Sequence, residues 1–402
     1  MSREMTINFE PNSYEFRANP YPVYEELRKA GPLFYWPEND AWVVVQYDAC
    51  NQYMRDQRIG FLEYPPNIDP DKDPIFAILS RWMVIRNPPD HTRLRGLVQK
   101  AFTPRRVENL RTKVEQIAGE LVDTLIERAQ SEGSADVIDT LTYPLPVNVI
   151  AELLGVPVED HNYFREWTEK IIRFMDVVDE PGLAADAKES ARKMRAYFER
   201  MAEERRTHPR DDLLSALLQV EEAGERLDIE ELYANCALLL IAGHETTVHM
   251  LGNGLLRLLQ NPAQLEMLRQ DPHLTAGAVE EMLRYDGPVH LTAPRFTLEE
   301  MEICGQHFAP KTKIRFLLGS ANRDDTQFHA ADTFDITRNP NPHLSFVSGI
   351  HYCLGAPLAR FEAIIALNAL LSRVPNLGLA DKPLEYRNNF VIRGLTELHV
   401  TV

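Results

Sequence analysis

Apolar residues recur at helical spacing over much of this chain, which predicts a mainly helical protein. Helical patterns run from His91 to about Tyr285, with prolines interrupting them at several points. A last helix is expected over roughly Ala356–Arg373, and a short one near Tyr21–Lys29. The helices therefore supply most of the expected core.

Two patches have the composition and turn residues of strands instead. Leu33–Trp36 and Trp42–Val45 flank a turn, and Pro294–Phe316 forms a second strand-rich patch. Residues 57–90 follow neither period and contain several prolines and aromatics, so we expect a long loop that serves a functional site.

The longest helix is expected from about Ile229 to Gln260. Asp228 and Glu231 resemble a capping box at its start, and Asn261-Pro262 ends the pattern. Such a helix would span roughly 48 Å. Its middle reads Ala242-Gly-His-Glu-Thr-Thr247, and glycine and β-branched alcohols are poor choices for a helix that only packs. These residues therefore indicate that the middle of this helix has a function besides packing.

Composition narrows the function. The chain has 402 residues, of which 44% are hydrophobic and 26% charged, as expected of a large globular protein. Its formal net charge of -17 disfavours nucleic acid and anionic lipid as partners. The amino terminus lacks the apolar core of a signal peptide, and no apolar run reaches bilayer length. We expect a cytoplasmic, monomeric protein that binds neither nucleic acid nor membrane.

The four cysteines are scattered, which favours reduced thiols over disulfides or structural zinc. Cys353 is distinctive because glycines flank it and a helix is expected to begin just after it. The positive end of that helix should lower the pKa of the thiol and stabilise a thiolate. A thiolate in such a loop suits haem iron, whereas a buried cysteine in a glycine-rich turn is the structural alternative.

The loop resembles the haem-binding loop of cytochrome P450s of the soluble bacterial kind. The family pattern Phe-x-x-Gly-x-His/Arg-x-Cys-x-Gly is met at Phe346, Gly349, His351, Cys353 and Gly355. One position departs from the family, because Val347 stands where glycine is common.

The resemblance covers nearly the whole chain and implies a single cytochrome P450 domain over residues 1–402. In that fold, a large helical lobe with a long central helix and a smaller β-rich lobe enclose the haem. The β-rich lobe would come mainly from residues 30–60, 290–318 and 380–402. The resemblance implies haem b (iron protoporphyrin IX) as cofactor, Cys353 as the iron ligand and Ala359 as a further haem contact.

The middle of the long helix resembles the family's oxygen-binding segment. There Ala242 and Gly243 would border the haem, and Gly243 would leave room for O2. Thr246 can hydrogen-bond back to the carbonyl of residue 242, and Glu245 offers a titratable group on a proton path. The resemblance makes Thr246 and Glu245 the catalytic residues. The alternative is a back-bonded threonine and a capped acid in a bent helix.

Two further sets of charged residues match the family. Glu281 and Arg284 resemble its buried structural Glu–Arg pair, although an exposed i,i+3 pair would read the same. His91 and Arg95, together with Arg295 and His351, would hold the haem propionates, since arginine binds carboxylates well. The alternative is four solvated bases. Phe102 resembles the aromatic residue that packs at the haem.

Residues 81–113 carry nine Lys and Arg against two acids, in an otherwise acidic protein. The resemblance implies an acidic electron donor, a ferredoxin or flavodoxin supplied by an NAD(P)H reductase, and this basic segment could steer it. A solvated helix face is the alternative.

The expected reaction is oxygen insertion into a bulky hydrophobic molecule of secondary metabolism, by hydroxylation or epoxidation. A peroxide-driven peroxygenase of the same fold and a non-catalytic haem sensor or electron carrier are the alternatives. The residues expected to line the substrate pocket are mostly apolar; they are Phe61, Tyr64, Phe76, Leu79, Trp82, Met83, Phe174, Leu238, Val289, Leu291, Ala293 and Ile392.

Overall fold

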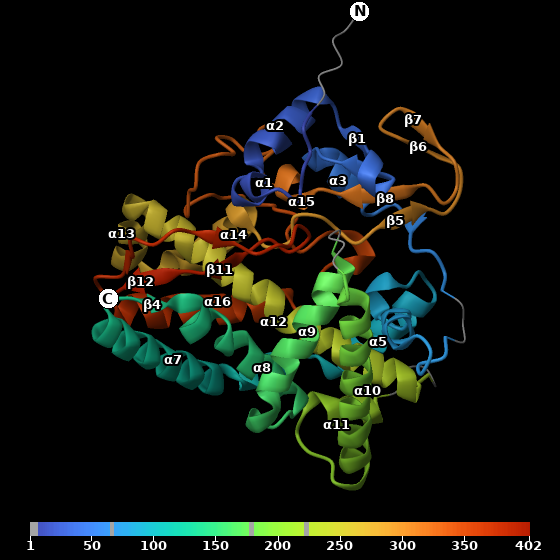
Figure 1. Ribbon diagram of the computed structural model, residues 1–402, viewed down its shortest axis with the longest axis horizontal. Helices are drawn as coiled ribbons and strands as arrows, with labels where there is room; N and C mark the ends of the chain where they lie inside the picture. Colours follow the sequence, from blue (N-terminus) through green and yellow to red (C-terminus); the bar gives the residue numbers. More distant parts are fainter. Residues whose placement is uncertain (1–6, 65–67, 177–180, 221–224) are drawn as a thin grey trace, which may run out of the picture.

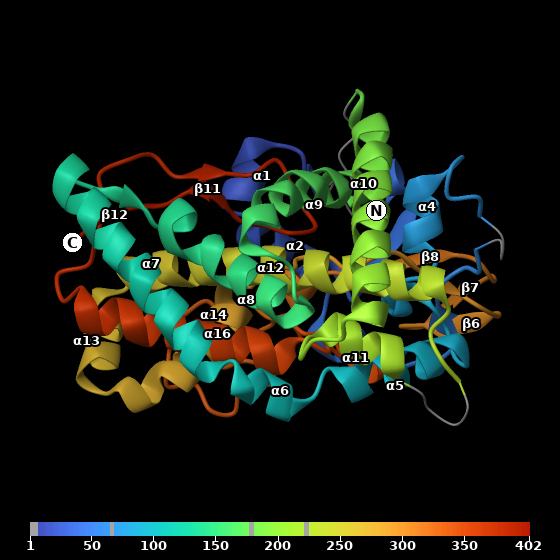
Figure 2. The same cartoon turned by 90° about the horizontal axis from the view of Figure 1, so that it is seen from below.

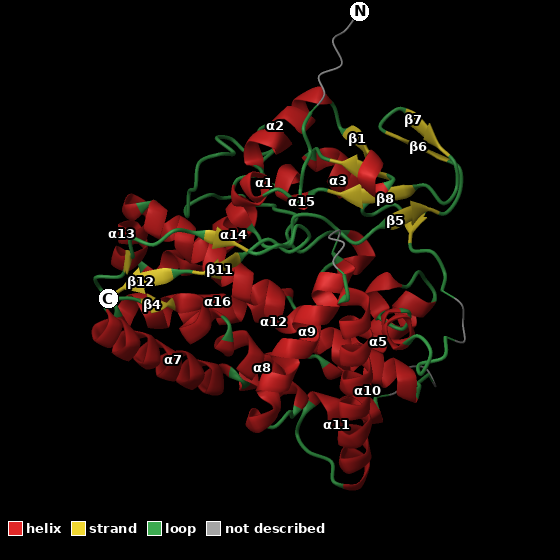
Figure 3. Cartoon of the chain, viewed as in Figure 1, coloured by secondary structure: helices red, strands yellow, loops and turns green. Residues whose placement is uncertain are grey.

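A helical lobe and a smaller lobe with most of the strands make up the structure (Figures 1 and 3). The computed structural model describes residues 7–64, 68–176, 181–220 and 225–402. Strands β1, β5 and β8 lie with α1–α3 at the top of Figure 1, and α7–α11 lie below. The mainly helical, two-lobed architecture expected from the sequence is confirmed.

The described helices vary in length from one turn to nine. They are α1 (Tyr14–Ala18), α2 (Tyr21–Ala30), α3 (Tyr47–Tyr53), α4 (Pro74–Leu79), α5 (Asp90–Ala101), α6 (Pro104–Asn109), α7 (Arg111–Glu132), α8 (Pro144–Leu154), α9 (His161–Met175), α10 (Leu183–Thr207), α11 (Leu213–Gln219), α12 (Ile229–Gln260), α13 (Pro262–Gln270), α14 (Thr275–Asp286), α15 (Leu318–Ala321) and α16 (Ala356–Arg373). None of these helices is long and apolar enough to cross a membrane.

Helix α12 runs through the middle of the molecule (Figure 2). Its bounds are those predicted, because both ends are set locally. The side chain of Asp228 accepts from the N–H of Glu231, and the Glu231 side chain accepts from the N–H of Asp228. Most of its side chains are buried against α8, α10 and α14. The helix therefore forms a rigid support at the centre of the core.

Five short strands form the main sheet, in the order β1 (Leu33–Trp36), β2 (Ala41–Val44), β8 (Lys313–Phe316), β5 (Arg295–Thr297) and β3 (Ile59–Gly60). Strands β2 and β8 are parallel and the other pairs antiparallel. The smaller sheets pair β6 (Met301–Ile303) with β7 (Gln306–Phe308), β10 (Glu385–Tyr386) with β11 (Leu395–Glu397), and β12 (His399–Thr401) with both β4 (Ala135–Asp136) and β9 (Gly378–Leu379). The main sheet places Arg295 next to Ile314 at the lobe boundary.

The prediction of one long loop over residues 57–90 is wrong in part. This segment contains β3, helix α4 and a 3-10 turn at Met83–Ile85. Pro74 starts α4, because its fixed φ suits the first helical turn. Ile75, Ile78 and Leu79 then bury their side chains in the helical core. A helix of six residues is too short to show a period in the sequence.

Candidate functional site

The loop from Phe346 to Gly355 places Cys353 directly before α16. The N–H of Cys353 donates to the carbonyl of Phe346 over 3.1 Å, which closes the loop. Gly349 has φ +76°, and a side chain there would lie 3.1 Å from the carbonyl oxygen of Met54. Both facts require glycine at this position. Cys353 itself is half-buried.

The expected lowering of the thiol pKa is not what the structure shows. Burial raises the pKa of Cys353 above its ordinary value and outweighs the opposing effects. The N–H groups of Gly355 and Ala356 and the charges of Arg95 and Arg360 do lower it, as the helix end predicts. The helix end thus favours the thiolate, but it does not by itself overcome the loss of water.

Val347 carries backbone strain in the same loop. Its φ is +53°, a left-handed conformation that is rare for a β-branched residue. Such a conformation costs roughly 1–3 kcal/mol. The side chain packs against an apolar cluster of the β-rich lobe that includes Met54, Phe328 and Leu344. This packing offsets the strain and attaches the loop to that lobe.

Four bases from three parts of the chain gather beside Cys353. The rings of His91 and His351 are 4.4 Å apart between centroids. Arg95 donates to the carbonyl of Tyr352 over 2.7 Å, and Arg295 donates to that of Met54 over 3.0 Å. We call His91, Arg95, Arg295 and His351 the base cluster.

The base cluster lacks a compensating acid. No carboxylate within the described part of the chain forms an ion pair with any of its members. Burial, followed by repulsion from the arginines, lowers the pKa of His91 to about 4. Burial, and after it chiefly the charge of Arg295, lowers the pKa of His351 to about 3. Burial lowers the pKa of Arg295 itself to about 10. Nδ1 of His351 is buried without a described hydrogen-bond partner. These residues fit a group with two carboxylates, such as the propionates of haem.

The centre of α12 is more exposed than the turns around it, which are buried. Thr246 is half-buried and Ala242 exposed. The Thr246 hydroxyl donates to the carbonyl of Ala242 over 3.2 Å, as predicted. Gly243 also serves helix packing, because a side chain there would lie 2.9 Å from Cγ1 of Ile150 in α8. That it leaves room for O2 stays a prediction.

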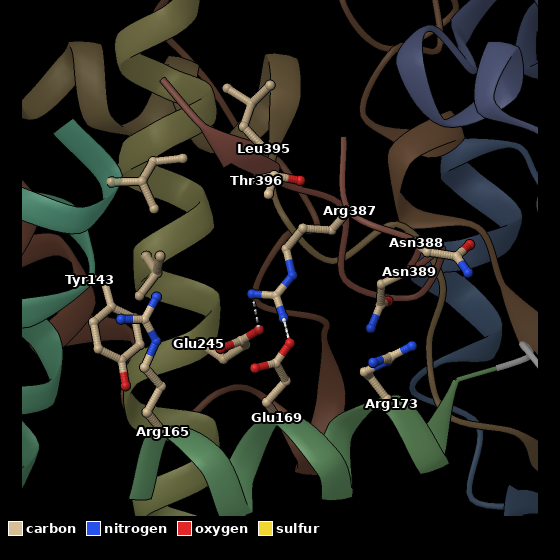
Figure 4. A pocket seen from close by; sticks show the side chains of 12 residues that line it. Tyr143, Arg165, Glu169, Arg173, Glu245, Arg387, Asn388, Asn389, Leu395 and Thr396 are labelled. Atoms are coloured by element: carbon tan, nitrogen blue, oxygen red, sulfur yellow. Dashed lines mark hydrogen bonds and ion pairs between the residues drawn. The ribbon is translucent and has the colours of Figure 1, made fainter. Parts of the chain in front are cut away.

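Glu245 lies on the neighbouring face of α12 and points to Arg387, which also contacts Glu169 of α9 (Figure 4). Nη1 of Arg387 is 3.1 Å from Oε1 of Glu245, and Nη2 is 3.1 Å from Oε1 of Glu169. Nε2 of His249 lies 3.3 Å from the same Glu245 oxygen. Burial alone would raise the pKa of Glu245, but the contacts with His249 and Arg387 hold it well below its usual value.

A polar cavity of about 310 Å³ opens beside Glu245. Glu245, Arg387, Glu169 and Tyr143 line it together with Arg165 and Asn389. Sequence reasoning missed Arg387 and His249. Arg387 is remote in sequence and has no motif, but His249 follows Glu245 at i+4, a spacing that places both on one helix face.

Glu281 and Arg284 of α14 form a fully buried ion pair. Nε and Nη2 of Arg284 donate to the two oxygens of Glu281 over 2.8 and 2.7 Å. Arg338 and Asn341 donate to the same carboxylate. Nη1 of Arg284 donates to the carbonyls of Asn322 and Ala331. The pair thus joins α14 to the segment that leads to the Cys loop, in keeping with a structural role.

The residues expected at the haem and substrate fall into three groups. Phe346 and Phe102 are buried, and Ala359 is half-buried near the start of α16. Tyr64, Phe76 and Phe174 form an aromatic row, each with centroids 6.2 Å from the next. The other residues of the helical lobe that were expected in the substrate pocket are buried in its core; they are Leu79, Trp82, Met83 and Leu238.

The residues of the β-rich lobe that were expected in the substrate pocket lie in several different surroundings. Val289 pairs with Ile392 in an isolated bridge, and Ala293 is exposed. Phe61 lies against the base cluster, with its ring centroid 5.3 Å from that of His351. Leu291 is fully buried among the core residues of the β-rich lobe. A role for any of these residues in a substrate pocket stays a prediction.

The basic segment 81–113 is more compensated than its sequence suggests. Arg93 pairs with Glu231, Arg106 with Asp211, and Arg111 with Glu108. Arg105 and Lys113 are exposed, and no acidic partner is found for them in the part of the chain that the structure describes. They lie at α6 and the start of α7. Arg111 lies over the ring of Phe361, which joins this region to α16, the helix that follows the Cys loop.

Comparison with known proteins places this geometry in context. A model of the cytochrome P450 family matches residues 10–375. The polyketide biosynthesis cytochrome P450 PksS of Bacillus subtilis is 38% identical, over 98% of this chain and 99% of its own. The cytochrome P450 monooxygenase PikC of Streptomyces venezuelae is 42% identical, over 96% and 92%. The solved structure of P450BioI with an acyl carrier protein bearing hexadec-9Z-enoic acid has a TM-score of 0.89 and 39% identity, over 97% of this chain and 100% of the other.

Proposed function

Because the chain belongs to the cytochrome P450 family of haem-thiolate oxidoreductases, we propose that it inserts one oxygen atom of O2 into a hydrophobic small molecule. The observation that carries this proposal is the base cluster, which is uncompensated and lies directly beside Cys353. When bound, haem b supplies the redox chemistry by which O2 is activated with two electrons. Cys353 would be the iron ligand, and the base cluster would hold the propionates.

The protein's own residues would control the protons. Thr246 holds its hydroxyl at the carbonyl of Ala242, on the more exposed face of α12. Glu245 borders the polar cavity, from which solvent can supply a proton. This arrangement supports oxygen-driven turnover, because O–O cleavage consumes protons delivered by a general acid.

Ligation is tested by spectroscopy. The ferrous carbon monoxide complex of the wild type should show the red-shifted Soret band of a thiolate-ligated haem. Cys353→Ser should abolish that band, whereas Cys304→Ser, at another half-buried cysteine, should keep it. A wild-type protein without the band, or a Cys353→Ser variant that retains it, would contradict the proposal.

The oxidant is tested by turnover. With a ferredoxin, its reductase and NADPH, Thr246→Ala should send more electrons to hydrogen peroxide and fewer to product. Equal product yields from peroxide and from O2 with NADPH, in wild type and variant alike, would favour a peroxygenase instead.

The substrate is proposed as a bulky hydrophobic metabolite, in keeping with the aromatic row of Tyr64, Phe76 and Phe174. The relatives support this class, since one is named for polyketide biosynthesis and another was solved with a fatty acyl group on its carrier. Spin-state shifts on addition of polyketides, fatty acids and steroids would identify the best ligand. No shift with any of these classes would contradict the proposal.

For the electron donor, we propose an acidic ferredoxin or flavodoxin that docks near Arg105 and Lys113. Ile350 and Tyr352 of the Cys loop are exposed and would provide apolar contacts to the same partner. Arg105→Glu with Lys113→Glu should slow reduction at low salt by about tenfold or more. Lys382→Glu, an exposed lysine elsewhere, is the control and should leave the rate unchanged. An unchanged rate in the double variant would remove this surface from donor binding.

A further inference from the structure

His249 occupies an ambiguous position between an acid and a base. Its Nε2 lies 3.3 Å from Oε1 of Glu245 and 3.4 Å from Nη1 of Arg387. A carboxylate only accepts hydrogen bonds and a guanidinium only donates them. When Nε2 of His249 carries a proton, it can donate to Glu245. When Nε2 carries no proton, it can accept from Arg387. One tautomer cannot do both.

The backbone holds the imidazole ring in this position. Strands β10 and β11 form a hairpin in which the N–H of Arg387 donates to the carbonyl of Gly394 over 3.0 Å. A side chain on Gly394 would lie 2.0 Å from Nδ1 of His249, so only glycine fits against the ring. The same hairpin thus brings Arg387 to Glu245 and confines His249. The two hydrogen-bond arrangements differ in proton position rather than in ring position.

The other charged and titratable groups around Glu245 are less suited to exchange a proton with it. On α12, Nε2 of His244 is 3.9 Å from Oε2 of Glu245, beyond a hydrogen bond, and its Nδ1 is bonded to the carbonyl of Leu240. Arg387 stays charged, and Glu169 reaches the site through Arg387. Tyr143, from the segment before α8, and Arg165 contact each other rather than Glu245.

We propose that His249 is a positioning residue that stores a proton for Glu245, an inference that rests on the proposed role of Glu245 in proton delivery. When a proton is drawn through Glu245, the imidazolium of His249 supplies it from Nε2 to Oε1 of Glu245, and Glu245 passes it on. The products are a neutral imidazole, which can accept from Arg387, and the Glu245 carboxylate, whose pKa His249 and Arg387 hold below its usual value. Solvent in the polar cavity, which Glu245 lines, later returns one proton through Glu245 to His249. No electrons move.

The first test measures the protonation state of His249 directly. In the diamagnetic ferrous carbon monoxide complex with labelled histidine, His249→Gln identifies the His249 signal by its loss. At a fixed neutral pH, Glu245→Gln should change the ring-nitrogen signals of His249 towards those of a neutral imidazole, because the carboxylate that faces its Nε2 is gone. Unchanged ring-nitrogen signals of His249 would overturn the proposal.

The second test measures the fate of electrons, with hexadec-9Z-enoic acid as the probe. His249→Gln keeps an N–H donor but does not titrate near neutral pH, and His249→Phe keeps neither property. Both should raise the share of NADPH electrons recovered as hydrogen peroxide towards that of Glu245→Gln. Gly394→Ala should do the same, because it displaces the ring without altering a titratable group. His161→Gln, at a half-buried histidine bonded to Asn148, is the matched control and should match the wild type.

The outcomes separate this inference from the proposed function. If Glu245→Gln raises the peroxide share while His249→Gln does not, Glu245 delivers protons without help from a titrating His249, and the inference fails. If His249→Phe raises it while His249→Gln remains at the wild-type level, His249 only donates a hydrogen bond, and proton storage is again excluded. If Glu245→Gln and Thr246→Ala both leave the share unchanged, the proposed proton route itself fails.

Discussion

Two groups of ionisable residues, one buried around Glu281 and one formed by the partly buried base cluster, differ in how they are compensated. The carboxylate of Glu281 receives hydrogen bonds from Arg284, Arg338 and Asn341. In the base cluster, Arg295 donates to the carbonyl of Met54 and lies over the rings of Phe61 and Phe316, but among the described residues it has no carboxylate partner. A buried charge is tolerated when it is paired. The charge of Glu281 is therefore compensated by residues of the protein itself, whereas the base cluster is compensated by a ligand of opposite charge.

The largest effect is expected from breaking the group around Glu281. Glu281→Gln leaves Arg284 and Arg338 without their counterion in the core, which should destabilise the haem-loaded protein by about 3–5 kcal/mol. Urea unfolding followed by circular dichroism and by haem absorbance measures this change. Glu302→Gln, at an exposed glutamate, should change stability by less than about 0.5 kcal/mol. Similar stabilities for the two variants would mean that the Glu281 network is dispensable.

An effect of opposite sign is expected in the base cluster. Arg295→Met removes a buried charge that lacks a counterion, so the haem-free protein should gain about 1 kcal/mol of stability. Haem should then leave the variant faster than the wild type, because one propionate partner is gone. Unfolding of the haem-free protein and haem transfer to apomyoglobin measure the two changes. A less stable haem-free variant would show that Arg295 is already compensated.

The smallest effect is a difference in pH dependence. The pKa of His91 is lowered to about 4 in the fold, from an ordinary value of 6.5. The unfolded chain therefore binds this proton first, and the haem-free protein should lose stability as the pH falls from about 6.5 towards 4. His91→Asn should flatten this slope. Bound haem should also flatten it in the wild type, since carboxylates beside His91 raise its pKa. Unfolding measured in this pH range, with and without haem, tests both statements.

What could be predicted from the sequence depends on how local the cause is. The bounds of α12 follow from a capping box and a proline within a few residues of its ends. The Glu281–Arg284 pair follows from i,i+3 spacing. By contrast, Arg338, Arg387 and Gly394 reach their partners from distant segments, and nothing near them in the sequence marks those contacts. The packing reason for Gly243 could not be predicted, because Ile150, which it accommodates, lies on another helix.

Val347 has a consequence for how the Cys loop opens. Its left-handed backbone is held by the packing of its side chain in the apolar cluster with Met54 and Leu344, together with the hydrogen bond from its N–H to the carbonyl of Leu344 over 2.8 Å. If that cluster loosens, the packing is lost and the strained backbone is released at the same moment. The loop therefore resists small fluctuations, and when it opens, the packing and the backbone conformation are lost together in one cooperative step. Amide hydrogen exchange in the loop should accordingly follow that of the β-rich lobe, although the loop leads directly into a helix of the other lobe.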